Sequence, residues 1–225
     1  MKTKLILSMA AVGALSLASA SADVTSVNVV GFVNVNLKTG FNLLSNPLAS
    51  TNGTETVATV LPSLPNGSFI SRWNSAAQSW GSPYQFNTDD NGPVGWDDPN
   101  QVIKAGEAFF LQVPNNVTIT FVGEVRQNPA YTMTTPLVLG FNFVGSQVPQ
   151  AGNISSLLGY AANNNELLYQ FNSGGGWKSP LGYNTDDNGP VGWDTAPAEP
   201  QLGIAEGVAV TRVIAGNWTR AFQVQ

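Results

Sequence analysis

The sequence predicts an all-β protein, with two homologous sandwich- or barrel-like modules that each contain one short helix and pack closely together. Three observations lead to this prediction. Apolar and polar residues alternate in several short segments, which is the period of a strand with one buried face. Turn-forming residues separate these segments at intervals of about 8 to 12 residues, as in sandwiches and barrels. A block of eleven residues also occurs twice without change, at 87–97 and 184–194.

The repeated block indicates the domain organisation. Its two copies are 97 residues apart, and weaker matches flank them at a spacing of 100 residues: 40–44 with 140–144, and 105–110 with 205–210. We therefore expect a first module over 23–127 and a second over 128–225. No linker rich in proline and serine separates the two, which favours close packing.

The strands follow in order from the residue pattern. Residues 27–37 alternate valine with mostly polar residues, and 41–48 form a second apolar segment that Pro47 helps to end. The remaining strands of the first module are expected at 69–73, 107–113 and 117–125. Those of the second are expected at 167–171, 208–213 and 218–224.

A short helix is expected in each module. Three apolar residues are spaced i, i+3, i+4 in both, with Pro62 after the first set and Gly159 after the second: Val57, Val60 and Leu61, then Ile154, Leu157 and Leu158.

The first 22 residues have the pattern of an export signal. Lys2 and Lys4 precede an apolar run over 5–18, and small residues form cleavage sites that end at Ala20 and Ala22. We therefore expect a secreted or cell-surface protein. After the signal, no segment approaches the roughly 20 apolar residues of a transmembrane helix, so no membrane span is expected.

The composition excludes several classes of chemistry. The chain contains no histidine and no cysteine, which excludes Ser-His-Asp and Cys-His catalysis, disulfides and the common structural zinc sites. The net charge is −5, with 9 basic against 14 acidic residues and no basic stripe. Nucleic acid is therefore not an expected partner.

Seven of the eight aspartates lie in or beside the repeated block, which makes it a candidate metal site. Oxygen-bearing side chains at alternating positions followed by glycine resemble the start of a calcium loop, and Ca²⁺ is the one cofactor that the sequence suggests. The candidate ligands are Asn87, Asp89, Asn91 and Asp98 in the first copy, and Asn184, Asp186, Asn188 and Asp194 in the second. The alternative is a structural turn, because Asp-Asn-Gly-Pro is dense in turn-forming residues.

The tryptophans suggest a glycan as a ligand. An exposed indole can stack on the C–H face of a sugar ring while neighbouring polar groups bond the hydroxyls. The best candidates are Trp96 and Trp193, beside the aspartates, followed by Trp80 and Trp177. The alternative is that these indoles complete small β cores.

An enzyme is not expected, and no catalytic residue is assigned. Without histidine, a reaction would need a carboxylate pair such as Asp97 or Asp98 with Glu107, and nothing else in the sequence supports such a pair. Self-association is a further candidate. The strand at 27–37 carries no charge that would guard an exposed edge, although burial within its own sheet is the alternative.

Several segments together resemble a recurrent β-module of extracellular bacterial proteins. They are 40–48 (Gly-Phe-Asn-Leu-Leu-Ser-Asn-Pro-Leu), the aromatic hairpin through Trp73 and Trp80, and 105–110 (Ala-Gly-Glu-Ala-Phe-Phe). The whole chain after the signal is similar to duplicated exported proteins of Verrucomicrobia-type bacteria. The resemblance implies a secreted β-module and supplies no catalytic residues. At 205–207 the second copy departs from the pattern, with Ala-Glu-Gly in place of the Gly-Glu order.

These observations lead to one expected function and one alternative. We expect an exported, non-enzymatic structural or adhesive protein of the cell surface or matrix, with the two aspartate-rich loops as candidate sites for stabilisation by calcium. The alternative is a carbohydrate-binding module that uses the loop tryptophans.

Overall fold

The computed structural model describes residues 29–51, 53–89, 94–129, 131–186, 191–196 and 198–224. The predicted signal at 1–22 and two of the predicted metal ligands, Asn91 and Asn188, lie outside the described residues. Within the described part of the chain the fold is all-β, as predicted.

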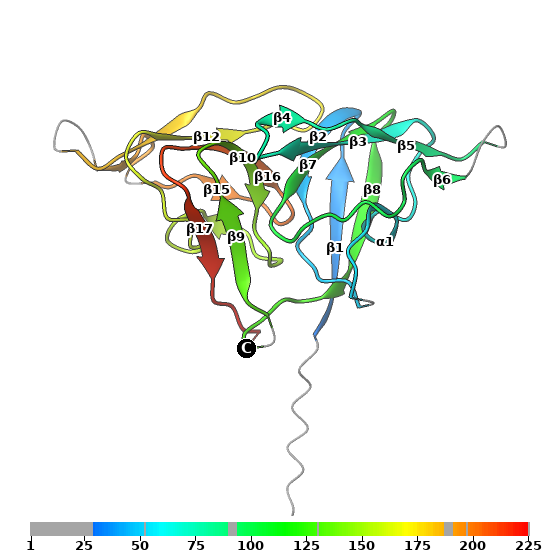
Figure 1. Ribbon diagram of the computed structural model, residues 1–225, viewed down its shortest axis with the longest axis horizontal. Helices are drawn as coiled ribbons and strands as arrows, with labels where there is room; N and C mark the ends of the chain where they lie inside the picture. Colours follow the sequence, from blue (N-terminus) through cyan, green and yellow to red (C-terminus); the bar gives the residue numbers. More distant parts are fainter. Residues whose placement is uncertain are drawn as a thin grey trace, which may run out of the picture.

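The first half of the chain forms a sheet with a two-stranded ribbon packed beneath it (Figure 1). The ribbon pairs β1 (Val30–Leu37) with β8 (Val117–Glu124). The sheet has the order β2 (Gly40–Ser45), β7 (Ala108–Val113), β3 (Ser68–Asn74), β5 (Tyr84–Asn87) and β6 (Gly95–Trp96), and β4 (Ser79–Trp80) pairs with β3.

The second half repeats this arrangement. Its ribbon pairs β9 (Met133–Leu137) with β17 (Gly216–Arg220). Its sheet has the corresponding order β10 (Gly140–Gly145), β16 (Gly207–Arg212), β12 (Glu166–Gln170), β13 (Leu181–Asn184) and β14 (Gly192–Trp193). A small additional ribbon pairs β11 (Gly152–Asn153) with β15 (Gln201–Leu202).

Each ribbon and its sheet enclose an apolar core, so each half is a two-layered sandwich. In the first half, Ile119 and Phe121 of β8 pack in one cluster with Ile70, Phe109 and Leu111 of the sheet. These side chains are buried, and burial of each stabilises the fold by about 1.5–3 kcal/mol. The second half has its own cluster, which includes Leu168, Val210 and Trp218.

Strand pairing corrects the predicted alignment of the last hairpins. Gly40 lies opposite Val113, and the corresponding Gly140 lies opposite Arg212. The spacing between equivalent residues is therefore 99 in this region, and the predicted value of 100 is wrong. With this register Glu206 corresponds to Glu107, and Ala205 takes the place of Gly106. The φ angle is positive at both of these positions, 61° for Ala205 and 75° for Gly106. The Ala-Glu-Gly order therefore preserves the turn.

The helix expected in the first half is present as α1 (Val57–Val60). Thr56 caps it, because its hydroxyl accepts a hydrogen bond from the backbone N–H of Thr59, whose side chain in turn accepts from the Thr56 N–H.

The helix expected around Ile154 to Leu158 is wrong: the segment forms a series of turns. The backbone N–H of Leu158 donates to Asn153 O, five residues back, and the Glu199 carboxylate accepts from the N–H groups of Ser155 and Ser156. Two i to i−4 bonds are present, from Leu157 N to Asn153 O and from Gly159 N to Ser155 O, but Leu158 and Tyr160 donate five and six residues back, so no continuous series of helical bonds forms.

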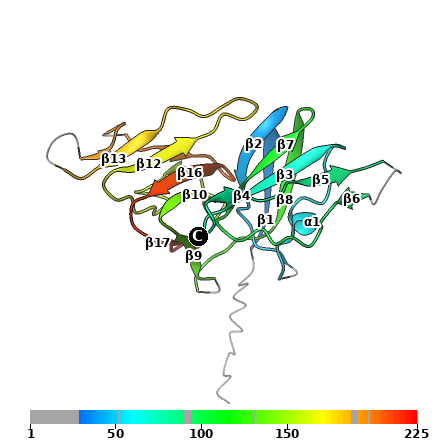
Figure 2. The ribbon, with the colours of Figure 1, turned by 45° about the horizontal axis from the view of Figure 1, so that its top comes forward.

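The two sheets join edge to edge, and equivalent bonds cross the junction in both directions. Ser45 N donates to Ala205 O at 2.9 Å, and Gly145 N donates to Gly106 O at 3.1 Å. A third apolar cluster lies on the junction and draws on both halves: Leu43, Ala108, Phe110, Phe143 and Ala209. The halves are therefore closely packed and share apolar surface. Figure 2 shows the two sheets side by side, with the view tilted toward the top of Figure 1.

Candidate functional site

Aromatic side chains gather above the junction, on the outer faces of the two sheets. They form one continuous set of ring contacts, which we call the aromatic platform: Phe41, Trp73, Trp80, Phe110, Phe141, Phe143, Tyr169, Phe171 and Trp177. Alternation along the strands explains the position of the set. In β7, Phe109 and Leu111 face the sandwich core, so Phe110 between them faces outward.

Trp80 and Trp177 are the most prominent members of the platform, and each is 45% exposed. Each indole contacts a ring of the opposite half. The Trp80 ring lies 4.8 Å from that of Phe143, and the Trp177 ring lies 5.8 Å from that of Phe110. Edge-to-face contacts of this kind hold both indoles in a defined orientation.

Two shallow grooves flank these indoles. One, of about 450 Å³, is lined by Trp73, Trp80 and Trp177 together with Phe141, Tyr169 and Lys178. The other, of about 490 Å³, is lined by Trp80 and Trp177 together with Phe41, Ser71, Pro83 and Phe171. Among the described residues that line the two grooves, Lys178 is the one charged side chain. The platform therefore suits a ligand that is uncharged and presents flat apolar faces.

Loops from each half anchor the platform across the junction. The indole N–H of Trp73 donates to Phe141 O at 3.0 Å, and the side chain of Gln78 bonds both the N–H and the C=O of Phe141. In the opposite direction, Gly174 N donates to Phe41 O at 2.8 Å. These contacts cover the outer edges of β2 and β10, which would otherwise expose unpaired backbone groups.

Trp96 and Trp193 do not contribute to the platform, which corrects the expectation that they are the leading ligand-stacking residues. They are 5% and 3% exposed. The indole N–H of Trp96 donates to Leu61 O at 2.8 Å, and that of Trp193 donates to Ser155 Oγ at 3.0 Å. Each indole closes one end of its sandwich core, where no ligand can reach its faces.

The acids after the two indoles have equivalent structural contacts. The carboxylate of Asp97 accepts hydrogen bonds from Gln85 N and Asn87 Nδ2, both at 3.1 Å. The carboxylate of Asp194 accepts from Gly182 N at 2.6 Å. Both acids therefore tie the ends of the hairpins β5–β6 and β13–β14, which contain the repeated block.

The other described members of the predicted metal sites do not converge. Asp98 accepts from Gln101 Nε2 at 2.6 Å, and Asp186 accepts from Asn164 Nδ2 at 3.0 Å. Asn184 accepts from the N–H of Asp186, which is a local Asx turn. Among the described residues, no group of three or more acidic side chains is placed to hold a metal ion. Because Asn91 and Asn188 lie outside these residues, the calcium sites stay a prediction, as does the role of Asp89.

Two ion pairs lie close to the junction between the halves. The carboxylate of Glu107 accepts two hydrogen bonds from the Arg72 guanidinium, at 2.7 and 2.9 Å. This pair lies in a crevice of about 440 Å³ between the halves. Arg126 is buried, pairs with Glu55, and also donates to Gln147 O of the second half at 3.1 Å.

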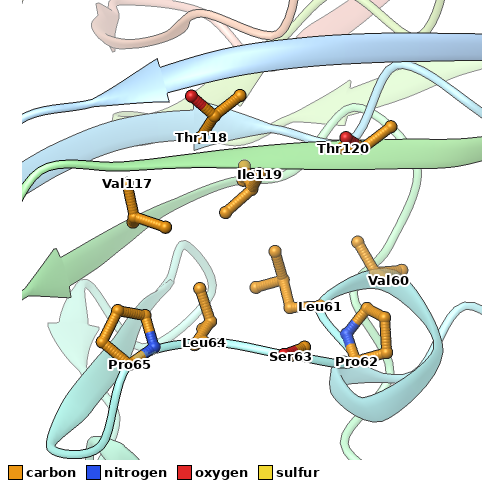
Figure 3. A pocket seen from close by; sticks show the side chains of 10 residues that line it. All are labelled: Val60, Leu61, Pro62, Ser63, Leu64, Pro65, Val117, Thr118, Ile119 and Thr120. Atoms are coloured by element: carbon orange, nitrogen blue, oxygen red, sulfur yellow. The ribbon is translucent and has the colours of Figure 1, made fainter.

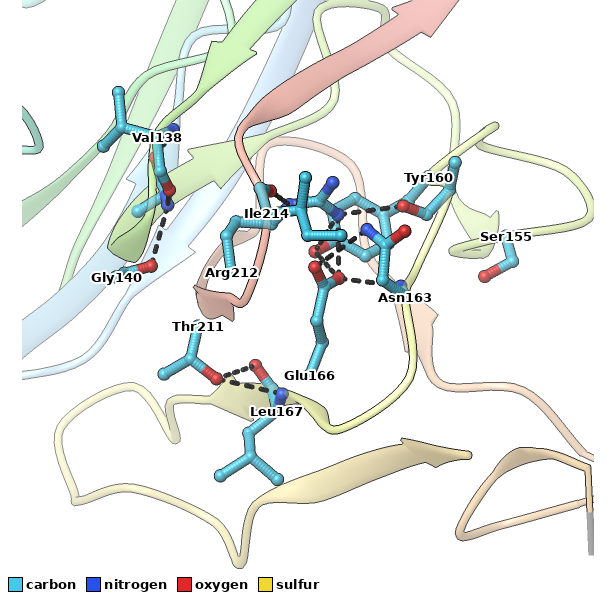
Figure 4. Close-up of polar contacts among 12 residues, drawn as sticks. Val138, Gly140, Ser155, Tyr160, Asn163, Glu166, Leu167, Thr211, Arg212 and Ile214 are labelled. Atoms are coloured by element: carbon cyan, nitrogen blue, oxygen red, sulfur yellow. Dashed lines mark hydrogen bonds and ion pairs between the residues drawn. The ribbon is translucent and has the colours of Figure 1, made fainter. Parts of the chain in front are cut away.

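The second sandwich contains a buried ion pair (Figure 4). Arg212 Nη1 lies 2.7 Å from Glu166 Oε2, and the Tyr160 hydroxyl donates to the same carboxylate at 3.2 Å. Burial, together with the Glu166 charge, raises the pKa of Tyr160 well above its usual range, although Arg212 opposes this effect. Because the carboxylate is fully engaged with Arg212, Tyr160 and Asn163, the cluster is a structural one.

A further pocket, of about 520 Å³, lies between the segment 60–65 and the start of β8 (Figure 3). Its walls are mostly apolar, with Leu61, Leu64 and Ile119 pointing toward one another. The described residues that line it include no ionisable side chain. It lacks the converging polar groups that usually orient a ligand, so it is a weaker candidate than the platform.

Comparisons with known proteins leave the site to be interpreted from its own geometry, because no family model, curated protein or solved structure matches this chain. Within the described residues, no helix has the length and apolar character needed to cross a bilayer.

Most of the platform was not predicted. The sequence pointed to Trp80 and Trp177 but not to their neighbours Phe110, Phe143 and Tyr169. One signal was available: 108–111 reads Ala-Phe-Phe-Leu without alternation, which indicates a strand covered on both faces.

Proposed function

We propose that this chain is an exported, non-enzymatic adhesive protein that binds a neutral polysaccharide through the aromatic platform. The observation that carries the proposal is the pair of equivalent, half-exposed indoles, Trp80 and Trp177, each packed edge-to-face against a ring of the opposite half. Rigid, exposed aromatic rings bind the C–H faces of sugars with little loss of conformational entropy.

The charge of the platform supports a neutral ligand over an anionic one. Lys178 is the one charged side chain on the described lining of the grooves, and a polyanion would need several. Since the two indoles rise from separate hairpins on the same outer surface, they can contact successive rings of one sugar chain. Such multipoint contact suits adhesion to an extended polymer better than capture of a small molecule.

The test is binding of residues 23–225 to insoluble cellulose and chitin, and to a soluble neutral β-glucan in affinity electrophoresis. Trp80→Ala and Trp177→Ala are each expected to weaken binding by about tenfold or more, as for a buried interface aromatic. Ile214→Ala is the matched control, because it removes another well-exposed apolar side chain that lies outside both grooves.

Two outcomes would contradict the proposal. One is an absence of binding to all of these polymers. The other is binding that both tryptophan variants retain at full strength. If the platform instead binds an apolar protein surface, Trp80→Ala and Trp177→Ala would weaken that binding as well. Competition separates the two cases, because free oligosaccharides would displace a polysaccharide from the platform but would not displace a protein.

A further inference from the structure

We propose that the open edge of β1 pairs antiparallel with β1 of a second copy, which joins two β1–β8 ribbons into one four-stranded sheet. This interaction is separate from the polysaccharide site, because β1 lies in the lower layer and the platform lies on the upper one (Figure 1). Four observations support it.

The first observation is the free backbone of β1. Its eight residues pair with β8 along their whole length, from Val30 opposite Glu124 to Leu37 opposite Val117. On the other edge, residues 30–37 form no backbone hydrogen bond with any described part of the chain. A long edge of this kind is a template for another strand.

The second observation is a difference in burial between the two strands of the ribbon. Ile119 and Phe121, which face inward from β8, are buried. Val33 and Val35, which face inward from β1, remain only partly buried. The core is therefore less well covered on the β1 side, and a strand added there would cover it.

The third observation is the orientation of two amides on the outer face. The Asn34 oxygen accepts a hydrogen bond from Thr120 Oγ1, and the Asn36 oxygen accepts from Thr118 Oγ1, both at 2.7 Å. Both threonines lie on β8, so the amide nitrogens are directed away from β8, toward the open edge. Neither nitrogen has a partner among the described residues.

The fourth observation is the contrast with β9, the equivalent strand of the second half. β9 has five residues, and Pro136 occupies the position of Asn36, because Pro136 lies opposite Asn217 as Asn36 lies opposite Thr118. Proline has no N–H and suits an edge that must not pair. β9 therefore has a protected edge, whereas β1 has neither a proline nor a charged residue.

A second copy fits this edge better than a foreign strand because β1 is complementary to itself. An antiparallel pair centred on Asn34 places Val33 opposite Val35 on the inner face. It also places the two Asn34 side chains next to each other on the outer face. Since β1 carries no charge, this symmetric pairing brings no like charges together.

The experiment is sedimentation equilibrium of residues 23–225, for which the wild type is expected to have the mass of a dimer. Asn36→Pro, which copies the sequence of β9, and Asn34→Lys, which places two like charges opposite each other, are expected to be monomers. Thr118→Lys makes the same change of charge on β8, one strand away from the edge, and is expected to stay a dimer. Circular dichroism verifies that each variant is folded.

A cross-link identifies the register. Because the chain has no cysteine, Asn34→Cys introduces a single thiol. Facing Cα atoms of an antiparallel pair are about 4.5–5.5 Å apart, within the range of a disulfide. Oxidation is expected to give a covalent dimer with Asn34→Cys and none with Thr118→Cys. A monomeric wild type, or a dimer that both edge variants retain, would overturn the proposal.

Discussion

Ser45 and Gly145 occupy equivalent positions in the two sheets and face each other across the junction. A Cβ atom built on Gly145 would lie only 2.1 Å from Ser45 Oγ. The neighbouring equivalent pair behaves in the same way, since a Cβ on Gly207 would lie 2.7 Å from that of Ala108. At both positions the first half has a side chain and the second half has glycine. The junction therefore requires two halves that differ at these sites.

This asymmetry gives a prediction on stability. Gly145→Ser is expected to lower the free energy of unfolding by about 1–3 kcal/mol, as for overpacking of a close contact. Adding Ser45→Gly should restore most of the loss, because the two residues then exchange places. Chemical denaturation of the single and double variants measures the coupling. Equal losses with and without Ser45→Gly would show that the contact is not the cause.

Tyr160 gives a prediction on alkaline pH. Its pKa is raised in the folded protein, so the folded state retains the hydroxyl proton at a pH where an unfolded tyrosine, with a pKa near 10, loses it. The contribution of protonated Tyr160 to the free energy of unfolding is therefore complete below about pH 10, and it falls by about 1.4 kcal/mol per pH unit above that pH. Tyr160→Phe should be less stable at neutral pH but should lose less stability between pH 10 and 11. Urea titrations across this range, with Tyr84→Phe as the control, test the difference.

The acids of the repeated block give a prediction that separates the turn from the calcium site. Asp97→Ala and Asp194→Ala remove acceptors of backbone N–H groups, and each is expected to cost about 0.5–1.5 kcal/mol, because these hydrogen bonds are exposed and water can replace the lost acceptor. If the carboxylates act through these bonds, the loss is the same in chelator and in millimolar calcium. If calcium binds, the wild type should melt at a higher temperature in calcium than in chelator, and Asp89→Ala combined with Asp186→Ala, which removes a predicted ligand from each copy, should abolish that increase.

The tryptophans are expected to fall into two groups. Trp96→Ala and Trp193→Ala should each cost about 3–5 kcal/mol of stability, because each empties a core position and orphans a hydrogen-bond acceptor. Trp80→Ala and Trp177→Ala should cost much less stability and should change binding instead. Thermal melts and polysaccharide binding, measured on the same four proteins, test this division. A large loss of stability in Trp80→Ala and Trp177→Ala would indicate that the platform has a structural role instead of a binding role.

The strand positions were predictable because their cause is local. Alternation with a period of two identifies a strand wherever one face is buried, and it located β1, β3, β8 and β12 to within three residues at each end. The cap of α1 is also local, since the hydroxyl of each of Thr56 and Thr59 accepts a hydrogen bond from the backbone N–H of the other. The helix predicted near Ile154 is absent, and this segment instead bonds residues far away in the sequence: Ile154 N donates to Pro200 O, and Ser155 N and Ser156 N donate to Glu199.

By itself, the sequence determined the all-β class and the repeated block, and it gave Trp80 and Trp177 as candidate ligand-binding residues, because these depend on local pattern and residue type. Only the tertiary structure decided which tryptophans are buried. Trp96 and Trp193 lie on inward faces beside Phe86 and Tyr183, while Trp80 and Trp177 lie on the outer surface at the junction. The tertiary structure also decided that β1 has an open edge and β9 a protected one. Burial and pairing depend on which distant strands become neighbours, and a local pattern carries no information about that choice.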